Sequence, residues 1–249
     1  DKPDGRDDYR AGHLPGAVYV DMDTQLATHG APSQGRHPLP SRETLQGAAR
    51  RWGLHAGDTV VVYDDYRSIS AARARWLLRG AGVRDIRVLD GGLSAWRAAE
   101  LPLETGDVSP EPGSIVFDGL DEGLSIDEAA AWPQHGLLLD ARAPERYRGE
   151  SEPFDPVAGH IPGAVNLPAD AVLDGASFAS PAAIRAAFES AGVSDLTPVA
   201  AYCGSGLTAA HTALAGAAAG LEVAVYPGSW SQWSNTPDRP VATGAEPGA

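Results

Sequence analysis

The chain has 249 residues, enough for one large domain or for two of about 120 residues each. Its formal net charge of −14 argues against a nucleic acid or an anionic membrane surface as a partner. No run of about 18 apolar residues predicts a membrane span. The single cysteine excludes an intrachain disulfide, and the opening DKPDGRDD lacks a signal-peptide pattern, so we expect a cytoplasmic protein.

Three motifs occur twice, in the same order, at a spacing of about 140 residues. The first pair reads GHLPGAVYV and GHIPGAVNL. The paired segments are 12–20 with 159–167, 60–63 with 199–202, and 90–96 with 227–233. Ordered matches of this kind indicate two tandem copies of one domain.

In both copies short apolar runs alternate with helical patterns, which predicts parallel strands covered by helices. In the first copy the strands are expected at 17–20, 59–63 and 86–89, and the helices at 41–52 and 68–81. In the second copy the strands are expected at 137–140, 164–167, 199–202 and 223–226, and the helices at 125–135, 181–191 and 207–219. Ser125 and Glu128 predict a capping box for the first of these helices.

We expect a first domain at 1–104 and a second at 123–249. The linker at 105–122 is rich in proline, glycine and acidic residues. The second copy has LLLDARAPERYRG ahead of its GHIPG, and the first copy has no equivalent. The first sheet is therefore expected to lack its opening strand.

The only cysteine stands where an apolar strand meets a helix. CGSGLT at 203–208 follows the strand, and the alanine-rich run after it ends at Gly220, a candidate C′ glycine. Gly204 and Gly206 let the backbone curl so that N–H groups point at the sulfur, and the helix N-terminus adds positive potential. This setting favours a thiolate nucleophile at Cys203; the alternative is a buried cysteine that only packs.

Together, the repeated GH[LI]PGA motif, Asp140-Ala141-Arg142 at a strand end and the CGSGLT loop resemble tandem-domain rhodanese-type sulfurtransferases. The resemblance covers almost the whole chain, and CGSGLT is most similar to the 3-mercaptopyruvate sulfurtransferase branch. It implies an α/β fold of two tandem rhodanese-like domains, each a parallel sheet flanked by helices. In that family the first domain has lost its cysteine, and here Asp64 stands where Cys203 stands in the repeat.

The resemblance implies that Cys203 takes sulfane sulfur from a small-molecule donor and holds it as a persulfide. The acceptor would be a thiol such as that of thioredoxin, or cyanide, and no metal or organic cofactor is implied. Because a persulfide is an anion, the N–H groups of the loop would stabilise it. The residues of this cradle are Gly204, Ser205, Gly206, Leu207 and Thr208.

A guanidinium group can bind the carboxylate of 3-mercaptopyruvate bidentately. By resemblance, Arg146 occupies the substrate-arginine position; Arg148 is the competing choice, and a solvated surface charge is the structural alternative. The branch often has a second arginine a little downstream, where this chain reads EPFD at 152–155.

The pyruvate enolate that leaves needs a proton, which the hydroxyl of Ser205 or Thr208, or a histidine, can donate. The branch pairs the loop serine with an aspartate and a histidine of the first domain. These map to Asp23 and His37, which predicts an active site between the two domains.

Several other residues are expected to have structural roles. His13 and His160 occupy equivalent positions of the repeat, so we expect them to support a turn. Asp140 is expected to orient the loop of Arg146 or to bind backbone N–H groups. Trp230 and Trp233 are expected to pack or to line a pocket, and His211 is expected to pack or to lie at the surface.

Three alternative functions are open. Thiosulfate is a possible donor, although a dianion needs more positive charge than Gly204 and Ser205 provide. A phosphatase on a related scaffold would need an arginine six positions after the cysteine, where the chain has Ala209. A non-catalytic rhodanese-like sulfur-carrier module is disfavoured by the intact loop and Arg146.

Overall fold

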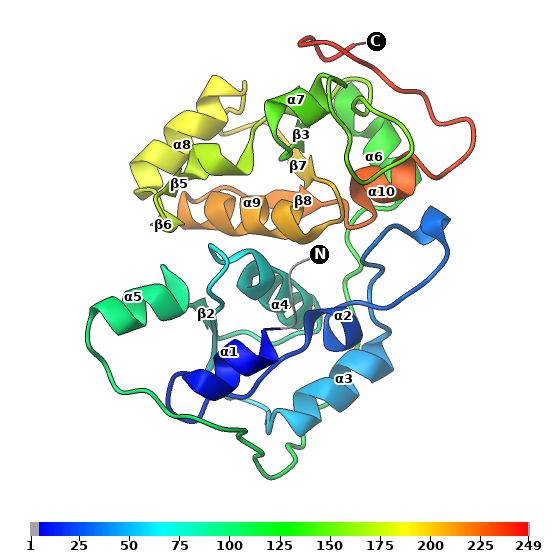
Figure 1. The fold of residues 1–249 in the computed structure, drawn as a ribbon. Coiled ribbons are helices and arrows are strands. Elements are labelled where there is room, and N and C mark those ends of the chain that lie inside the picture. Colours follow the sequence, from blue (N-terminus) through cyan, green and yellow to red (C-terminus); the bar gives the residue numbers. More distant parts are fainter. Residues whose placement is uncertain (1–4, 249) are drawn as a thin grey trace. The chain divides into compact units, whose positions relative to one another are not determined.

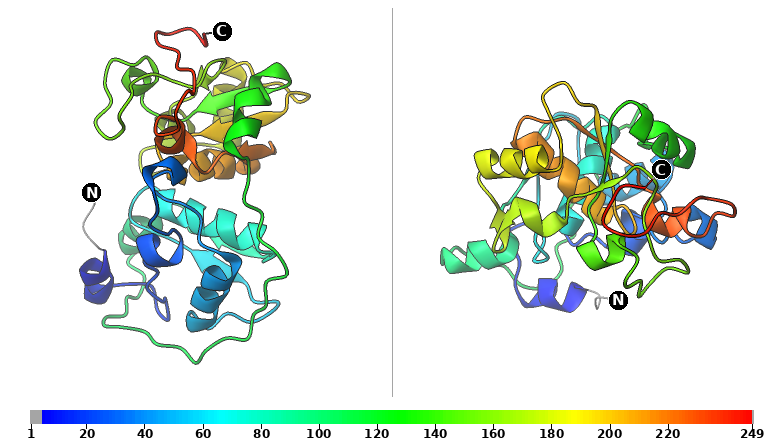
Figure 2. Two further views of the ribbon diagram at one scale, coloured as in Figure 1. Left: turned by 90° about the vertical axis from the view of Figure 1, so that its right-hand side faces the viewer. Right: turned by 90° about the horizontal axis from the view of Figure 1, so that it is seen from above.

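The computed structural model describes residues 5–248, which divide into two compact units. Unit 1 comprises residues 5–28 and 39–121, and unit 2 comprises residues 29–38 and 122–248. In both units parallel strands are flanked by helices (Figure 1 and Figure 2). The segment 29–38 belongs to unit 2 by its contacts, although in the sequence it lies inside the first copy of the repeat.

The sheet of unit 2 has four parallel strands in the order β4-β3-β7-β8. Their bounds are β3 (Leu137–Asp140), β4 (Val165–Asn166), β7 (Val199–Tyr202) and β8 (Val223–Val225), which confirms the four predicted strands. The chain passes from β3 to β4 on one side and returns on the other side of β3 as β7. This reversal brings together the loops that follow β3 and β7, which is where ligands bind in open α/β sheets.

Helices and shorter elements complete unit 2. They are η1 (Pro32–Gln34), α6 (Ile126–Ala131), η2 (Trp132–Gln134), α7 (Pro144–Tyr147), η3 (Ala169–Val172), β5 (Leu173–Asp174), β6 (Ser177–Phe178), α8 (Pro181–Ser190), α9 (Leu207–Ala218) and α10 (Ser229–Trp233). Alternate strand residues Leu138, Ala200 and Tyr202 pack with Trp230 and Trp233 of α10 in one buried cluster. The helix α9 contacts β7 and β8, and α8 packs against α9.

The predicted helices of unit 2 are present with small differences. The capping box of Ser125 and Glu128 is confirmed at the start of α6. The helix expected to run to 135 instead ends at Ala131 and continues as the 3-10 turn η2, because Pro133 has no N–H to donate to the preceding turn. Gly220 follows α9 with φ +76, as a C′ glycine requires.

Unit 1 has two parallel strands, β1 (Val60–Val62) and β2 (Ile86–Val88), within its described residues. Its helices are α1 (Arg6–Ala11), α2 (Met22–Gln25), α3 (Arg42–Arg51), α4 (Ile69–Gly80) and α5 (Gly92–Ala98). Buried Leu45, Leu77 and Leu78 from α3 and α4 form the centre of its core with Phe117.

The strand predicted at 17–20 is wrong, because these residues form no strand. Their counterpart β4 in unit 2 pairs with β3 alone. Within residues 5–121 no strand occupies the position that β3 has in unit 2. A strand needs a neighbour to accept and donate its backbone hydrogen bonds, so an apolar run without one stays extended but unpaired.

The repeated histidines support turns, as predicted. His13 and His160 are fully buried, and each ring stacks on a tyrosine of the same copy, Tyr9 and Tyr147, with centroids 4.2 and 3.8 Å apart. Both nitrogens of each ring contact backbone carbonyl oxygens. Tandem copies therefore keep the same buried aromatic support under the GH[LI]PGA turn.

The hydrogen-bond pattern confirms that Asp64 stands where Cys203 stands in the repeat. The N–H of Leu93 donates to the carbonyl oxygen of Asp64 at 3.2 Å, and the N–H of Trp230 donates to that of Cys203 at 2.9 Å. Cys203 directly follows β7, and Asp64 lies two residues after the end of β1.

The carboxylate of Asp64 accepts backbone N–H groups from the loop before α4 and from the first turn of α4. It accepts from Tyr66, Ser68 and Ala71 at 2.8, 2.9 and 2.9 Å. A built-in anion therefore satisfies the amides of this loop in unit 1, where the corresponding loop of unit 2 has a sulfur atom.

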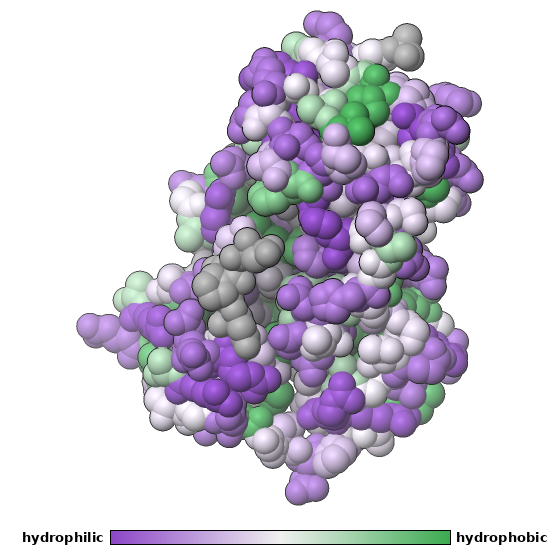
Figure 3. Space-filling view, turned by 45° about the vertical axis from the view of Figure 1, so that its right-hand side comes forward, coloured by the Kyte–Doolittle hydropathy of each residue, from purple (hydrophilic) through white to green (hydrophobic). Residues whose placement is uncertain are grey.

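The face drawn in Figure 3 is mainly hydrophilic, with smaller hydrophobic areas. This agrees with the formal charge of −14. Within residues 5–248 no helix has both the length and the apolar character that crossing a bilayer demands.

Replacing Asp64 with alanine should destabilise the protein by roughly 1–3 kcal/mol, because three backbone N–H groups lose their acceptor. Urea unfolding followed by tryptophan fluorescence measures this change. Asp118→Asn, at an exposed position of the same unit, is the matched control and should stay within about 0.5 kcal/mol of the parent. Equal stability of Asp64→Ala and the parent would show that water satisfies these amides.

Candidate active site

Cys203 directly follows β7, and its sulfur lies at the start of α9. The residue is 2% exposed, and the N–H of Gly206 donates to Sγ at 3.1 Å. Gly206 is the N-cap of α9, and no side chain caps this helix end. The N–H groups of Leu207 and Thr208 therefore have no partner inside the helix, so they are available to an anion on the sulfur.

Gly206 is required at this turn for two reasons. Its φ of +87 lies in the left-handed region, and a Cβ built on it would lie 2.3 Å from the carbonyl oxygen of Pro227. Any side chain would therefore separate the loop from Pro227 and move the N–H that binds Sγ.

Ser229 supports the cysteine from the neighbouring turn. Its hydroxyl accepts from the N–H of Cys203 at 3.1 Å, donates to the carbonyl of Tyr226 at 2.9 Å and lies 3.9 Å from Sγ. Ser229 is buried and has φ +54, a strained conformation for a residue with a side chain. Sequence reasoning missed it; the signal was its repeat partner Gly92, whose φ is also positive.

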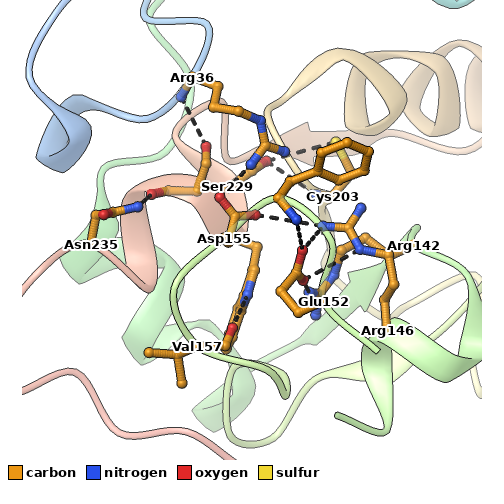
Figure 4. Close-up of polar contacts among 12 residues, drawn as sticks. Arg36, Arg142, Arg146, Glu152, Asp155, Val157, Cys203, Ser229 and Asn235 are labelled. Atoms are coloured by element: carbon orange, nitrogen blue, oxygen red, sulfur yellow. Dashed lines mark hydrogen bonds and ion pairs between the residues drawn. The ribbon is translucent and has the colours of Figure 1, made fainter. Parts of the chain in front are cut away.

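Arg146 lies in α7, and its guanidinium group is held by two buried carboxylates. Nε and Nη2 donate to Glu152 at 3.3 and 2.6 Å, and Nη2 lies 3.5 Å from Oδ2 of Asp155. A Cβ built on Gly204 would be 3.2 Å from Nη1 of Arg146. The arginine therefore reaches the loop beside Cys203 (Figure 4).

A second guanidinium group reaches the same glycine from the segment 29–38. A Cβ on Gly204 would lie 3.0 Å from Nη2 of Arg36, whose Nη1 forms an ion pair with Asp155. The backbone N–H of Arg36 donates to the hydroxyl of Ser231 in α10 at 3.0 Å. Figure 4 shows the Arg36 side chain pointing toward Asp155 and the Cys203 loop.

Asp155 carries the unfavourable charge of this cluster. Its side chain is 2% exposed. Burial raises the pKa of the Asp155 carboxyl above its ordinary 3.8; the ion pair with Arg36 only partly offsets this, while Glu152 raises the pKa further and Arg146 lowers it. Ionisation of Asp155, which the ion pair with Arg36 requires, therefore lowers the free energy of unfolding.

Arg142 binds the carboxylates of Asp140 and Glu152. It donates to Asp140 through its backbone N–H at 2.9 Å and through Nη2 at 2.6 Å, and to Glu152 through Nη1 at 3.2 Å. Burial alone would lower the pKa of Arg142, but the charge of Asp140 and the hydrogen bonds to it raise that pKa above its ordinary value. Asp140 thus fixes Arg142 and, through Glu152, orients Arg146, which agrees with its predicted role.

The other residues predicted for the site lie on several different elements. Ser205 and Thr208 are partly exposed on the loop, and His37 is partly exposed with a buried Nδ1 in the segment 29–38. Asp23 lies in α2 of unit 1 with an exposed side chain. Arg148, the alternative to Arg146, is 35% exposed and pairs with Glu150 at 2.7 Å.

The residues expected to pack do so. Trp230 and Trp233 are buried and donate to the carbonyls of Val157 and Pro240, each at 2.9 Å. His211 is buried and stacks on Phe178 with the centroids 4.7 Å apart. Among the described residues, no group of three histidine, cysteine or acidic side chains is arranged to hold a metal ion.

A family model described as "Rhodanese-like domain" matches residues 4–99 and 125–236. The chain belongs to this family. It is 46% identical to a putative thiosulfate sulfurtransferase of Mycobacterium tuberculosis, over 98% of this chain and 88% of that protein. It is 44% identical to a probable 3-mercaptopyruvate sulfurtransferase of Pseudomonas aeruginosa, over 95% of this chain and 86% of that protein.

A solved structure extends the likeness to three dimensions. The crystal structure of a 3-mercaptopyruvate sulfotransferase from Escherichia coli superposes with a TM-score of 0.82 at 33% identity, over 91% of this chain and 86% of that one. The fold of two rhodanese-like domains is thereby confirmed, and the chain is a sulfurtransferase.

Replacing Gly206 with alanine should cost roughly 2–4 kcal/mol of stability and abolish most of the activity, because the new Cβ meets a backbone oxygen. Gly220→Ala is the matched control at the other end of α9. Its φ is also positive, but the nearest atom is 3.8 Å away, so it should cost about 1 kcal/mol and leave activity intact. If both variants behave alike, the contact with Pro227 has no effect.

Asp155→Asn should unfold at pH 7 with a free energy equal to or above that of the parent. Because burial raises the pKa of Asp155, the stability contributed by its neutral form is present below pH 3.8 and is lost as the pH rises through the raised pKa. The difference between variant and parent should therefore shrink toward acid in urea titrations. Asp195→Asn, 82% exposed, should change the stability by less than about 0.5 kcal/mol at every pH.

A loss of more than about 1 kcal/mol in Asp155→Asn at pH 7 would contradict this reading. The ion pair with Arg36 would then stabilise the fold on balance.

Proposed function

We propose that this sulfurtransferase takes sulfur from 3-mercaptopyruvate, carries it as a persulfide on Cys203 and delivers it to an acceptor thiol. The observation that supports this most is the pair of guanidinium groups beside the cysteine loop. An α-keto acid has a carboxylate and a ketone oxygen, and both accept hydrogen bonds from such groups. The relatives named 3-mercaptopyruvate sulfurtransferase support the same donor.

The thiolate of Cys203 attacks the sulfur of the donor and forms a sulfur–sulfur bond. The carbon–sulfur bond breaks, and its electron pair remains on carbon as the enolate of pyruvate, which then takes up a proton. Ser205 or Thr208 from the loop, with His37 and Asp23, are the proposed proton donors. The N–H groups of Gly206, Leu207 and Thr208 are proposed to stabilise the persulfide anion.

An acceptor thiolate then attacks the outer sulfur of the persulfide and restores Cys203. We propose a small thiol, cyanide or a redox protein such as thioredoxin as the acceptor, in the cytoplasm. A persulfide is attacked by a thiolate in the same way as a disulfide, so this step needs no further cofactor.

Thiosulfate is the second candidate donor, and a specific observation favours it. The loop alone offers little positive charge to a dianion, but Arg36 and Arg146 both reach Gly204. The relative from Mycobacterium tuberculosis is named as a putative enzyme for this donor.

Steady-state turnover with each donor and cyanide as the acceptor decides between the two donors. We expect kcat/KM to be higher with 3-mercaptopyruvate and Cys203→Ser to be inactive with both. Faster turnover of thiosulfate would replace the proposed donor. Turnover retained in Cys203→Ser would refute the persulfide.

Arg146→Ala should lower kcat/KM for 3-mercaptopyruvate about 30- to 1000-fold, since roughly 2–4 kcal/mol of charge-assisted binding is lost from the transition state. Arg148→Ala is the control, because its side chain is paired with Glu150 at the surface, and it should behave as the parent. An equal loss in both variants would point to general electrostatics rather than to a contact of Arg146 with the donor.

A further inference from the structure

We propose that Arg36 is a donor-binding residue of this active site. The segment around Arg36 lies more than a hundred residues from the other arginine in sequence, yet both guanidinium groups meet at Gly204. This inference rests on the proposed function and adds to it a second residue that recognises the anionic end of the donor.

In each guanidinium group the nitrogen nearest to the loop lies outside the hydrogen bonds to the carboxylates. Arg36 uses Nη1 for Asp155, and Arg146 uses Nε and Nη2 for Glu152. Within residues 5–248 neither Nη2 of Arg36 nor Nη1 of Arg146 has a hydrogen-bond acceptor, and these two atoms lie 3.0 and 3.2 Å from a Cβ built on Gly204. Two positively charged N–H donors thus lie next to Gly204, the residue that follows Cys203.

Two buried carboxylates and one aromatic ring allow these two positive charges to lie close together. Asp155 and Glu152, 2% and 3% exposed, lie on the inner side of the two guanidinium groups and neutralise them. The ring of Phe154 lies 5.4 Å from Arg36 and 5.3 Å from Arg146, so each cation contacts the same aromatic ring. The EPFD segment therefore lacks an arginine of its own but places two others.

Glycine at position 204 lets both guanidinium groups approach the cysteine loop closely. A side chain at position 204 would fill the space within 3.0–3.5 Å of three guanidinium nitrogens. An anion bound to these two guanidinium groups would lie beside the loop that carries Cys203. The ligand class that fits is a small oxyanion, such as the carboxylate of 3-mercaptopyruvate or the oxygen atoms of thiosulfate.

Turnover kinetics test the contact directly. Arg36→Ala should raise KM for 3-mercaptopyruvate about tenfold to a hundredfold and lower kcat much less, because the group binds the donor away from the reacting sulfur. Arg36→Lys should recover only part of the loss, since it keeps the charge without the planar fork. Arg185→Ala, similarly exposed and paired in the same unit, is the control that should leave both constants unchanged.

A second measurement does not depend on turnover. Cys203 is the only cysteine, so its alkylation can be followed by mass without ambiguity. The ratio of the rate with anionic iodoacetate to that with neutral iodoacetamide reports the positive charge at the sulfur, and it should fall about fourfold or more in Arg36→Ala. The neutral reagent corrects for any change in the thiol itself or in the fold.

The two failures are distinguishable. If the parent turns over neither donor, the proposed function is wrong, and the alkylation ratio still decides the role of Arg36. If the parent is active but Arg36→Ala keeps both its KM and its alkylation ratio, Arg36 is a structural ion-pair partner of Asp155 and this inference is overturned.

Discussion

The hydrogen bond from the N–H of Gly206 to the sulfur of Cys203 is the contact on which the site depends. It exists because a buried parallel strand ends at Tyr202 and a helix begins at Leu207, with only a glycine-rich turn between them. The helix has no side-chain cap, so the polar start of α9 faces the sulfur instead of an oxygen of its own. An anion on the sulfur would complete the helix end, which supports the persulfide that we propose on Cys203.

The two copies of the repeat differ in the group that accepts the backbone N–H groups before the helix. In unit 1 the carboxylate of Asp64 accepts hydrogen bonds from three backbone N–H groups. In unit 2 the equivalent sulfur accepts from the N–H of Gly206, and no side chain caps the start of α9. A carboxylate cannot carry a sulfane sulfur, so the sulfur transfer that we propose for Cys203 has no counterpart at Asp64.

Much of this arrangement could be predicted from the sequence, and the failures have physical causes. Apolar runs such as 199–202 and the capping box at Ser125 are local signals, and they led to the right elements. The run 17–20 carries the same signal but forms no strand, because pairing depends on a neighbour that the pattern does not reveal. The sequence predicted Arg146 by resemblance, but Arg36 could not be found in this way, since its contact with Asp155 joins residues 119 positions apart.

Two destabilising features that the sequence does not reveal lie around the proposed site. One is a strained backbone conformation, and the other is a buried carboxyl group. Ser229 is held at positive φ behind the cysteine, and burial raises the pKa of Asp155 although it pairs with Arg36. A positive φ and a buried carboxylate each cost stability. Ser229 accepts from the N–H of Cys203, and Asp155 pairs with Arg36, which we propose binds the donor.

The most direct test of the central claim is the intact mass of the protein after brief incubation with 3-mercaptopyruvate in the absence of an acceptor. The account predicts a gain of about 32 Da, one sulfur atom, located on Cys203 and removed by added thiol. An unchanged mass in a protein that turns over the donor would contradict it, because sulfur would then pass to the acceptor without a persulfide on this cysteine.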